Sequence, residues 1–192
     1  MVQIQHLSSN PLHKHIYIAN IYTMTPIVFT AHEEALWLSI QAGTTFFGDG
    51  STTCIIRGNV LRHFYVDLER LNKITAAGIH LDGSSRENTK IIIVADDGIM
   101  IDLENLSSAD ANPLPTLSIK RCHIISPLSI KGSHFAALSI DECEIIKINA
   151  DHVQIDNYLS LRHLRPYSHD TNKQSQIRLV GARIDGRIDL RS

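Results

Sequence analysis

The apolar residues in the second half of the chain recur about every five positions, and this spacing restricts the possible folds more than any other feature. They come in pairs separated by one residue, and the second members of successive pairs lie five or six positions apart. The pairs are Leu117/Ile119, Cys122/Ile124, Leu128/Ile130, Ser133/Phe135, Leu138/Ile140, Cys143/Ile145, Ile148/Ala150 and Val153/Ile155. A helix requires apolar steps of three and four, and a plain strand requires unbroken steps of two. The pattern therefore predicts parallel strands of three to five residues, with the paired residues inward and a corner after each strand.

The tripeptide Leu-Ser-Ile occurs three times in this region, starting at Leu117, Leu128 and Leu138. The first and third copies are 21 residues apart, as are Cys122 and Cys143. If four five-residue faces make one coil, like side chains stack in neighbouring coils, about 4.8 Å apart. The middle copy would then lie on the opposite wall. We therefore interpret the repeat as a core-forming pattern and not as a binding motif.

These positions resemble the pentapeptide-repeat right-handed β-helix, in which a small and a large apolar residue alternate inward. The resemblance covers about residues 117–164 and resumes at the segment IRLVGARIDGRIDL. The chain departs from the family where Asp or Asn usually precedes the central apolar residue, since it has Ser or His there. The resemblance implies a mainly β protein, with a short right-handed β-helix preceded by a small α+β region.

Three regions are predicted along the chain. Residues 1–29 form a tail without acidic residues, similar to the N-terminal signals of bacterial type III secreted effectors. Residues 30–112 form the small α+β region, and residues 113–192 form the β-helix. The boundary is the segment SSADANPLP, because its residues favour turns and extended backbone.

The α+β region is expected to begin with a helix in TAHEEALWLSIQAG, where Thr30 and Glu33 have the spacing of a capping box. Two ββα-like units then follow, at Thr53–Ala77 and Lys90–Ser108. Each is expected to contain a hairpin around a glycine-containing turn. Asp67 and Asp102 would each be the N-cap of a helix after the second strand.

The composition excludes several functional classes. The chain has 18 Lys and Arg against 20 Asp and Glu, which argues against nucleic acid as the main partner. The most apolar early segment, IYIANIYTMTPIVFTA, is too short for the roughly 20 residues of a membrane span. Three widely spaced cysteines and scattered histidines favour neither a disulfide framework nor a zinc site. We predict no metal site, no cofactor and no membrane span.

No residue set specifies a reaction, so no catalytic residue is assigned. Cys122 and Cys143 are expected to be buried side by side as small apolar residues. His123 is expected to stack beside Glu144, as a solvated contact and not as an acid–base pair.

The segment RPYSHDTNKQSQ interrupts the repeat, and such insertions in solenoids often carry binding function. Its Arg165, Tyr167 and His169 are the candidate binding residues. We hypothesise a non-catalytic protein-protein interaction module with a protein partner. It would act in the bacterial cytoplasm, or as a virulence effector secreted into a host cell by a type III system. The alternatives are a DNA mimic that acts on a topoisomerase and a polysaccharide-acting β-helix enzyme.

The last segment, GRIDLRS, contains no amphipathic helix that could cover the final strand. A β-helix that ends in this way leaves backbone groups unpaired and apolar side chains exposed. We therefore expect either a homodimer formed through the C-terminal coils or a continuation into a longer protein.

Overall fold

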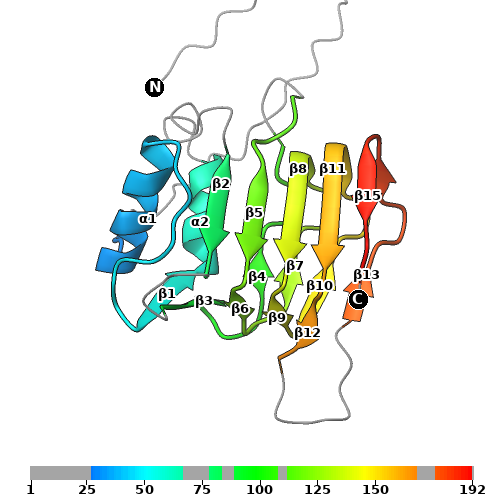
Figure 1. Cartoon of the computed structure of the whole chain (residues 1–192). Helices are drawn as coiled ribbons and strands as arrows, with labels where there is room; N and C mark the ends of the chain where they lie inside the picture. The colour runs from blue at the N-terminus through cyan, green and yellow to red at the C-terminus, as the bar shows by residue number, and fades with distance from the viewer. Residues whose placement is uncertain (1–26, 67–77, 84–88, 108–111, 168–175, 192) are drawn as a thin grey trace, which may run out of the picture.

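The computed structural model describes residues 27–66, 78–83, 89–107, 112–167 and 176–191. In these ranges the chain forms two helices and three sheets of parallel strands, and no sheet closes on itself (Figure 1). The fold is mainly β, as predicted. Residues 1–26 of the predicted tail lie outside the described residues.

Helix α1 (Ala31–Gln41) has the predicted capping box. The backbone N–H of Glu33 donates to Thr30 Oγ1 at 3.3 Å, and the backbone N–H of Thr30 donates to Glu33 Oε2 at 2.9 Å. Leu36 and Ile40 are buried, so the apolar side of this helix faces the core. Glu33 is also buried, and it holds the side chain of Arg57 at 2.6 to 2.8 Å.

The two predicted hairpins are wrong. The first expected turn begins helix α2 (Gly58–Val66), because its apolar residues Val60, Leu61, Phe64 and Tyr65 have helical spacing and are buried together. The two strands expected to flank the second turn pair with strands elsewhere in the chain and not with each other.

The N-cap expected at Asp102 is also wrong. Its carboxylate accepts the backbone N–H of Glu104 at 2.8 Å, and no helix follows among residues 103–107. Asp67 lies outside the described residues.

The strands are divided among three sheets. Sheet 1 contains, in spatial order, β1 (Thr53–Arg57), β3 (Lys90–Val94), β6 (His123–Ile124), β9 (Glu144–Ile145) and β12 (Arg165–Pro166). Sheet 2 contains β4 (Ile101–Asp102), β7 (Leu128–Ser129), β10 (Lys147–Asn149) and β13 (Gln176–Arg178). Sheet 3 contains β2 (Ile79–Asp82), β5 (Leu117–Lys120), β8 (His134–Asp141), β11 (Gln154–Arg162) and β14 (Arg183–Ile184), and β15 (Arg187–Asp189) also pairs with β11.

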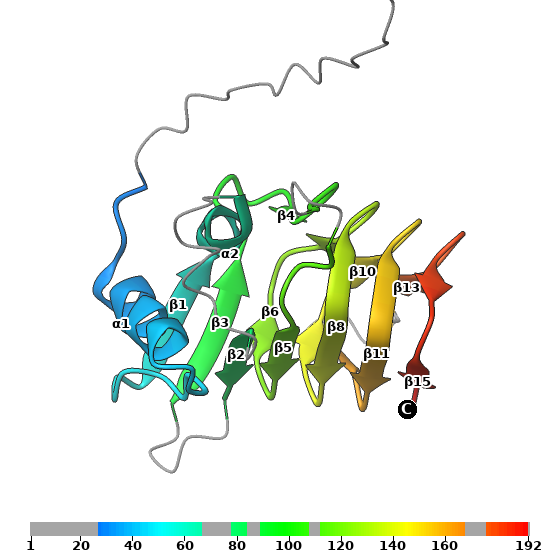
Figure 2. The same cartoon turned by 90° about the horizontal axis from the view of Figure 1, so that it is seen from above.

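The described chain passes through sheet 1, sheet 2 and sheet 3 in that order, again and again (Figure 2). In the first passage, β1 is followed by α2 and then by β2, so the helix occupies the place of a sheet 2 strand. The next passage is β3, β4, β5, and the later ones repeat this order. Each sheet contains strands from before and after the predicted boundary at residues 107–115. The two predicted regions therefore share one hydrophobic core.

The Leu-Ser-Ile copies stack as predicted. Leu117, Ser118 and Ile119 of β5 are in register with Leu138, Ser139 and Ile140 of β8, 21 residues later. The middle copy begins in β7, on sheet 2. Leu117 and Ile119 therefore continue into Leu138 and Ile140 as two columns of core residues across neighbouring strands.

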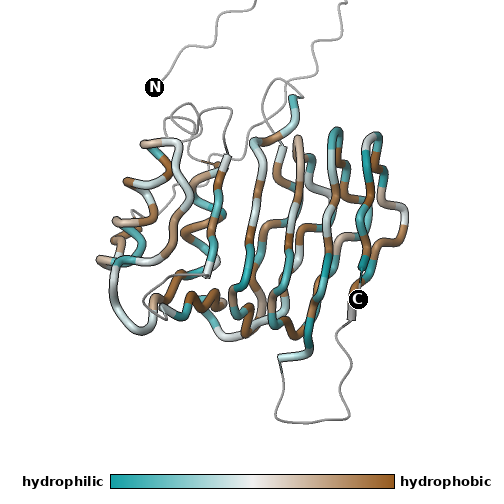
Figure 3. The backbone as a smooth tube through the Cα atoms, viewed as in Figure 1, coloured by the Kyte–Doolittle hydropathy of each residue, from teal (hydrophilic) through white to brown (hydrophobic). Residues whose placement is uncertain are grey.

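All sixteen paired positions point into the core, where none is more than 2% exposed. Polar and apolar residues alternate along the strands (Figure 3). The described residues between 117 and 155 contain no helix, which agrees with the prediction.

The predicted strand lengths and the four faces are wrong in detail. The strands between residues 117 and 155 range from two residues to the eight of β8, and the described strands form three sheets. Two expected faces merge in β8 and again in β11, because the expected corner is replaced by a shift in pairing between Ile155 and Tyr158. The chain bends there through an extra residue and stays in one sheet.

The corners that do occur use left-handed backbone. Arg121, Glu142 and His163 follow β5, β8 and β11 at intervals of 21 residues, with φ of 52°, 55° and 50°. A second corner, between sheets 2 and 3, has positive φ at Asn105, Gly132, His152 and Gly181. In the described chain, every non-glycine residue with positive φ lies at one of these two corners. The corner geometry therefore repeats with the strands.

Candidate interaction surface

The last strands of the three sheets end at one side of the molecule, opposite helix α1 (Figure 1). They are β12 in sheet 1, β13 in sheet 2, and β14 and β15 in sheet 3. Each pairs with one preceding strand, so its other edge carries backbone groups that no described strand pairs. We call the outer face of these strands, with Ile177, Val180, Ile188 and Leu190, the terminal edge surface.

The apolar residues of this surface are exposed although they continue buried columns. Ile177 is in register with Ile148, and Ile188 with Leu159. Ile148 and Leu159 are fully buried, whereas Ile177 is 41% and Ile188 is 50% exposed. Val180 and Leu190 are also more than half exposed. The sequence predicted apolar exposure at this end, and the structure agrees.

Arginines surround the apolar residues of the terminal edge surface. Their side chains are more than half exposed, and they are Arg178, Arg183, Arg187 and Arg191. Asp189 is mostly buried, and its Oδ2 forms an ion pair with Arg191 at an N···O distance of 2.5 Å. The guanidinium groups of Arg162 and Arg187 each lie 3.9 Å from the same oxygen. Hydrogen bonds from Arg191 hold the pKa of Asp189 below its usual range. The rim thus combines fixed carboxylates with exposed guanidinium groups.

Two of the three predicted binding residues lie beside this surface. Arg165 is exposed in β12, in register with Glu144 of β9. The backbone N–H of Tyr167 donates to the carbonyl of Ile145 at 2.7 Å, and its ring meets the ring of His123 edge-to-face with centroids 6.3 Å apart. His169 lies outside the described residues.

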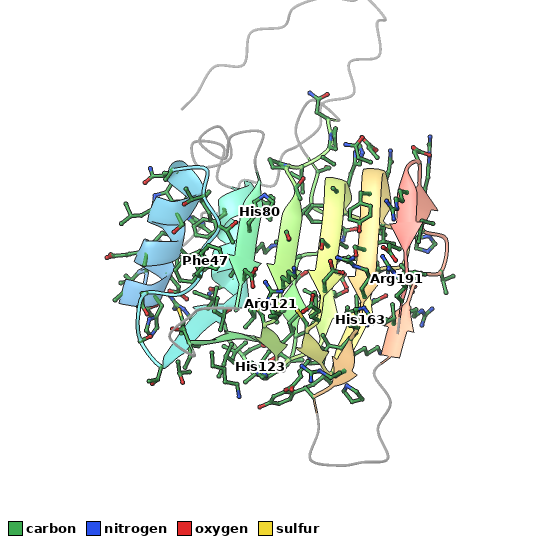
Figure 4. The ribbon with its side chains drawn as sticks, viewed as in Figure 1. Phe47, His80, Arg121, His123, His163 and Arg191 are labelled. Atoms are coloured by element: carbon green, nitrogen blue, oxygen red, sulfur yellow. The ribbon has the colours of Figure 1, made fainter. Side chains whose placement is uncertain are left out.

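A hollow of about 230 Å³ lies on the same corner, lined by Arg121, Cys122, His123, Glu142, Glu144 and Arg165. A neighbouring, more open hollow of about 590 Å³ is lined by Glu142, His163, Leu164 and Arg165. Figure 4 labels Arg121 and His163, which follow β5 and β11, and His123 of β6. Both hollows are shallow features of the corner between sheets 3 and 1.

The carboxylates of this corner each have a histidine, arginine or lysine side chain beside them. His123 Nδ1 lies 2.8 Å from Glu144 Oε2, as the sequence predicted for these stacked residues. Glu142 lies 3.4 Å from Arg121 and 3.8 Å from Lys120. Alternating charge of this kind gives neither the continuous acidic face of a DNA mimic nor a pair of unpartnered carboxylates.

Asp141, at the end of β8, fixes the outer side of sheet 3 next to this corner. Its carboxylate accepts hydrogen bonds from Ser139 Oγ (2.9 Å), Ser160 Oγ (2.5 Å) and Arg162 Nη2 (2.8 Å), and from the Arg162 backbone N–H (3.1 Å). Burial opposes its ionisation, but these hydrogen bonds lower the pKa of Asp141 to about 2. This contact was not predicted, because its only trace in the sequence is the 21-residue separation of Asp141 and Arg162, which are in register in the structure.

The cysteines are free thiols in the core, as predicted for Cys122 and Cys143. Burial raises the pKa of Cys143 to about 12 and that of Cys122 well above its ordinary value. These two thiols are protonated at neutral pH and unsuited to nucleophilic chemistry.

A group of metal-ligand residue types occurs at the other end of the molecule. His32, Asp49 and Cys54 place one potential ligand atom each within 4.8 Å of the others. This group could not be found from the sequence, because the three residues have no recognised metal-binding spacing.

No helix among the described residues is long and apolar enough to cross a membrane. No protein family model, curated protein or solved structure matches this chain.

Proposed function

We propose that the three sheets are the walls of a short right-handed β-helix of the pentapeptide-repeat kind. The constant order of sheets and the 21-residue register between β5 and β8, and between β6 and β9, support a coiled chain path. The buried columns support it as well, because each inward residue stacks on its counterpart in the next strand. The long strands β8 and β11 depart from the usual four faces of that family.

We infer that the chain is a non-catalytic protein-interaction module whose binding site is the terminal edge surface. One observation carries this proposal: Ile177 and Ile188 occupy core positions of the stacked columns and are nevertheless about half exposed. Covering them would remove apolar area from water, at roughly 25 cal/mol per Å². The free strand edges beside them can accept a further strand through backbone hydrogen bonds.

The arginines around the terminal edge surface indicate which side chains a partner would need. Exposed arginines surround the apolar centre, and arginine is enriched in protein interfaces because its guanidinium group binds carboxylates in a bidentate manner. A partner that offers an extended segment with apolar and acidic side chains would satisfy both parts of the surface. A second copy of this chain is one such partner, because the side chain of Asp185 on the same rim is 44% exposed.

From the composition of residues 1–29 we also propose a bacterial protein that acts in the cytoplasm or is delivered to a host cell by a type III system. This proposal is independent of the interaction surface.

The interaction is tested with a double substitution, Ile177→Lys with Ile188→Lys, in the full chain. The matched control is Leu38→Lys, which places the same charge on an exposed apolar residue of α1 at the opposite end. Light scattering over a micromolar concentration series measures self-association. Cross-linking in bacterial and host lysates, followed by mass spectrometry, measures other partners.

We expect the wild type and the Leu38→Lys control to form a dimer or retain the same protein, and the double variant to lose it. A wild type that stays monomeric and retains nothing beyond what the double variant retains would contradict the proposal.

A further inference from the structure

Three side chains of metal-binding types meet at the end of the molecule opposite the terminal edge surface. His32 lies in the first turn of α1, Asp49 lies in the loop that follows this helix, and Cys54 is the second residue of β1. His32 Nδ1 lies 2.5 Å from Asp49 Oδ2, and Cys54 Sγ lies within 4.8 Å of both side chains' ligand atoms. The group therefore joins a helix, a loop and a strand.

The carboxylate of Asp49 is held in place by a neighbour. Asp49 Oδ1 accepts the hydroxyl of Ser51 at 2.6 Å and the backbone N–H of Ser51 at 3.1 Å, which leaves Oδ2 directed at His32. Hydrogen bonds from Ser51 lower the pKa of Asp49 to about 2, so the group is anionic at neutral pH. Metal ligands are commonly oriented in this way by a second hydrogen-bonding group.

Cys54 lies on the inner side of this pair. Its side chain is fully buried, and desolvation together with the charge of Asp49 raises the pKa of the thiol to about 12. A divalent cation between the three ligand atoms would balance the carboxylate charge and stabilise a thiolate at this position.

We propose that His32, Asp49 and Cys54 bind one Zn²⁺ ion through imidazole nitrogen, carboxylate oxygen and thiolate sulfur, with the fourth position open to water. Mixed nitrogen, oxygen and sulfur ligands suit Zn²⁺, whereas Mg²⁺ and Ca²⁺ prefer oxygen alone. On binding, the hydrogen bond between His32 Nδ1 and Asp49 Oδ2 opens, the Nδ1 proton passes to solvent or to Nε2, and the freed nitrogen and oxygen bind the ion. The S–H bond of Cys54 breaks, an S–Zn bond forms, and the thiol proton passes to solvent. The ion would fasten α1 and the following loop to β1.

The first test uses Co²⁺ as a spectroscopic substitute for Zn²⁺ in the reduced full chain. We expect one equivalent of Co²⁺ to produce a thiolate-to-cobalt charge-transfer band that Zn²⁺ abolishes. Cys54→Ser should lose this band, and the control Cys122→Ser should keep it. His32→Gln and Asp49→Asn should weaken binding about tenfold or more.

The second test does not depend on the cysteine variant remaining folded. Free Zn²⁺ at 100 times its dissociation constant should raise the melting temperature of the wild type by about 5–10 °C. His32→Gln, a change at a partly exposed side chain, should remove this rise and leave the melting temperature without zinc nearly unchanged. A charge-transfer band that persists in Cys54→Ser, cobalt binding without a thiolate band, or no rise in the wild type would overturn the proposal.

Discussion

Ile145 and Ile146 are neighbours in the chain with opposite surroundings: Ile145 is fully buried and Ile146 is 38% exposed. Ile145 ends β9 and stacks on Ile124 of β6, whereas Ile146 lies at the bend between β9 and β10. The same residue type therefore occurs inside and outside the core in adjacent positions.

The same substitution at both positions tests whether Ile145 points into the core and Ile146 toward solvent. Ile145→Asp would bury an unpaired carboxylate and should lower the free energy of unfolding by several kcal/mol, on the order of 3–5. Ile146→Asp should change it by less than about 1 kcal/mol. Urea unfolding followed by circular dichroism measures both, and equal losses would show that the two side chains have been assigned incorrectly.

The buried carboxylate of Asp141 predicts a pH dependence of stability. Its pKa in the folded protein is about 2, below its ordinary value of 3.8, so the unfolded chain takes up the proton first as the pH falls. The stabilisation should be complete above about pH 5 and disappear as the pH falls toward 2. Asp141→Asn should therefore cost on the order of 1–2 kcal/mol at pH 7, with solvent screening of Arg162 taken into account, and progressively less in acid.

Glu142→Gln is the control for Asp141→Asn. It removes the neighbouring carboxylate, whose side chain is 41% exposed, and should cost less than about 1 kcal/mol at pH 7. A difference between wild type and Asp141→Asn that does not shrink between pH 5 and pH 2 would contradict the ionic role of Asp141.

The left-handed corners predict that glycine is preferred over valine at a corner position, whereas valine is preferred at a strand position. His152 has a φ of 55°, where glycine is unstrained and a β-branched residue is disfavoured. His152→Gly should therefore be more stable than His152→Val by about 1–2 kcal/mol. At Lys147, an exposed position of strand β10, the order should reverse, since valine suits a strand better than glycine. Thermal unfolding of the four variants measures both differences, and the same order at both sites would be inconsistent with left-handed corner geometry.

The 21-residue register predicts that one passage of the chain can be removed. Deletion of residues 122–142 joins Arg121 to Cys143 and brings β3 beside β9 and β5 beside β11 with matching side chains. We expect a folded protein with cooperative unfolding at a lower temperature, because one layer of buried side chains is lost. Deletion of residues 122–132 would place sheet 3 residues in sheet 1 and should abolish cooperative unfolding. Circular dichroism melts distinguish these outcomes, and similar melts for both deletions would refute the proposed coil.

The sequence predicted the inward residues well because a single physical requirement controls them. Each short strand buries one side, so the burial pattern repeats wherever the chain path repeats, as at Leu117 and Leu138. Strand length was not predictable in the same way. The bulge near Ile155 is a local change in pairing, and it leaves the apolar spacing almost unaltered.

The hairpins failed because a strand and a helix compete for the same apolar residues after Arg57. Val60, Phe64 and their neighbours could alternate as a strand or form one side of a helix. In the structure they form the buried side of α2, which packs against β4. In the candidate binding region, the sequence predicted that the repeat is interrupted from Arg165 onward. That boundary is wrong, because β12 continues the pairing of sheet 1 through Arg165 and Pro166, and the backbone N–H of Tyr167 still donates to Ile145. The convergence of His32, Asp49 and Cys54 was not predictable, because it depends on how α1 packs against β1.

Helix α1 covers part of the edge of β1, and this limits the number of molecules that could assemble through their strand edges. At this end of sheet 1, Glu33 of α1 accepts the backbone N–H of Arg57 at 3.1 Å, so helix α1 already occupies part of the edge that an incoming strand would use. A head-to-tail assembly would have to displace this helix with each added molecule. In a two-fold dimer formed through the terminal edge surfaces, both of these surfaces are buried and no further molecule can bind there. The unequal ends therefore favour closed assemblies over filaments, even though each copy carries exposed strand edges.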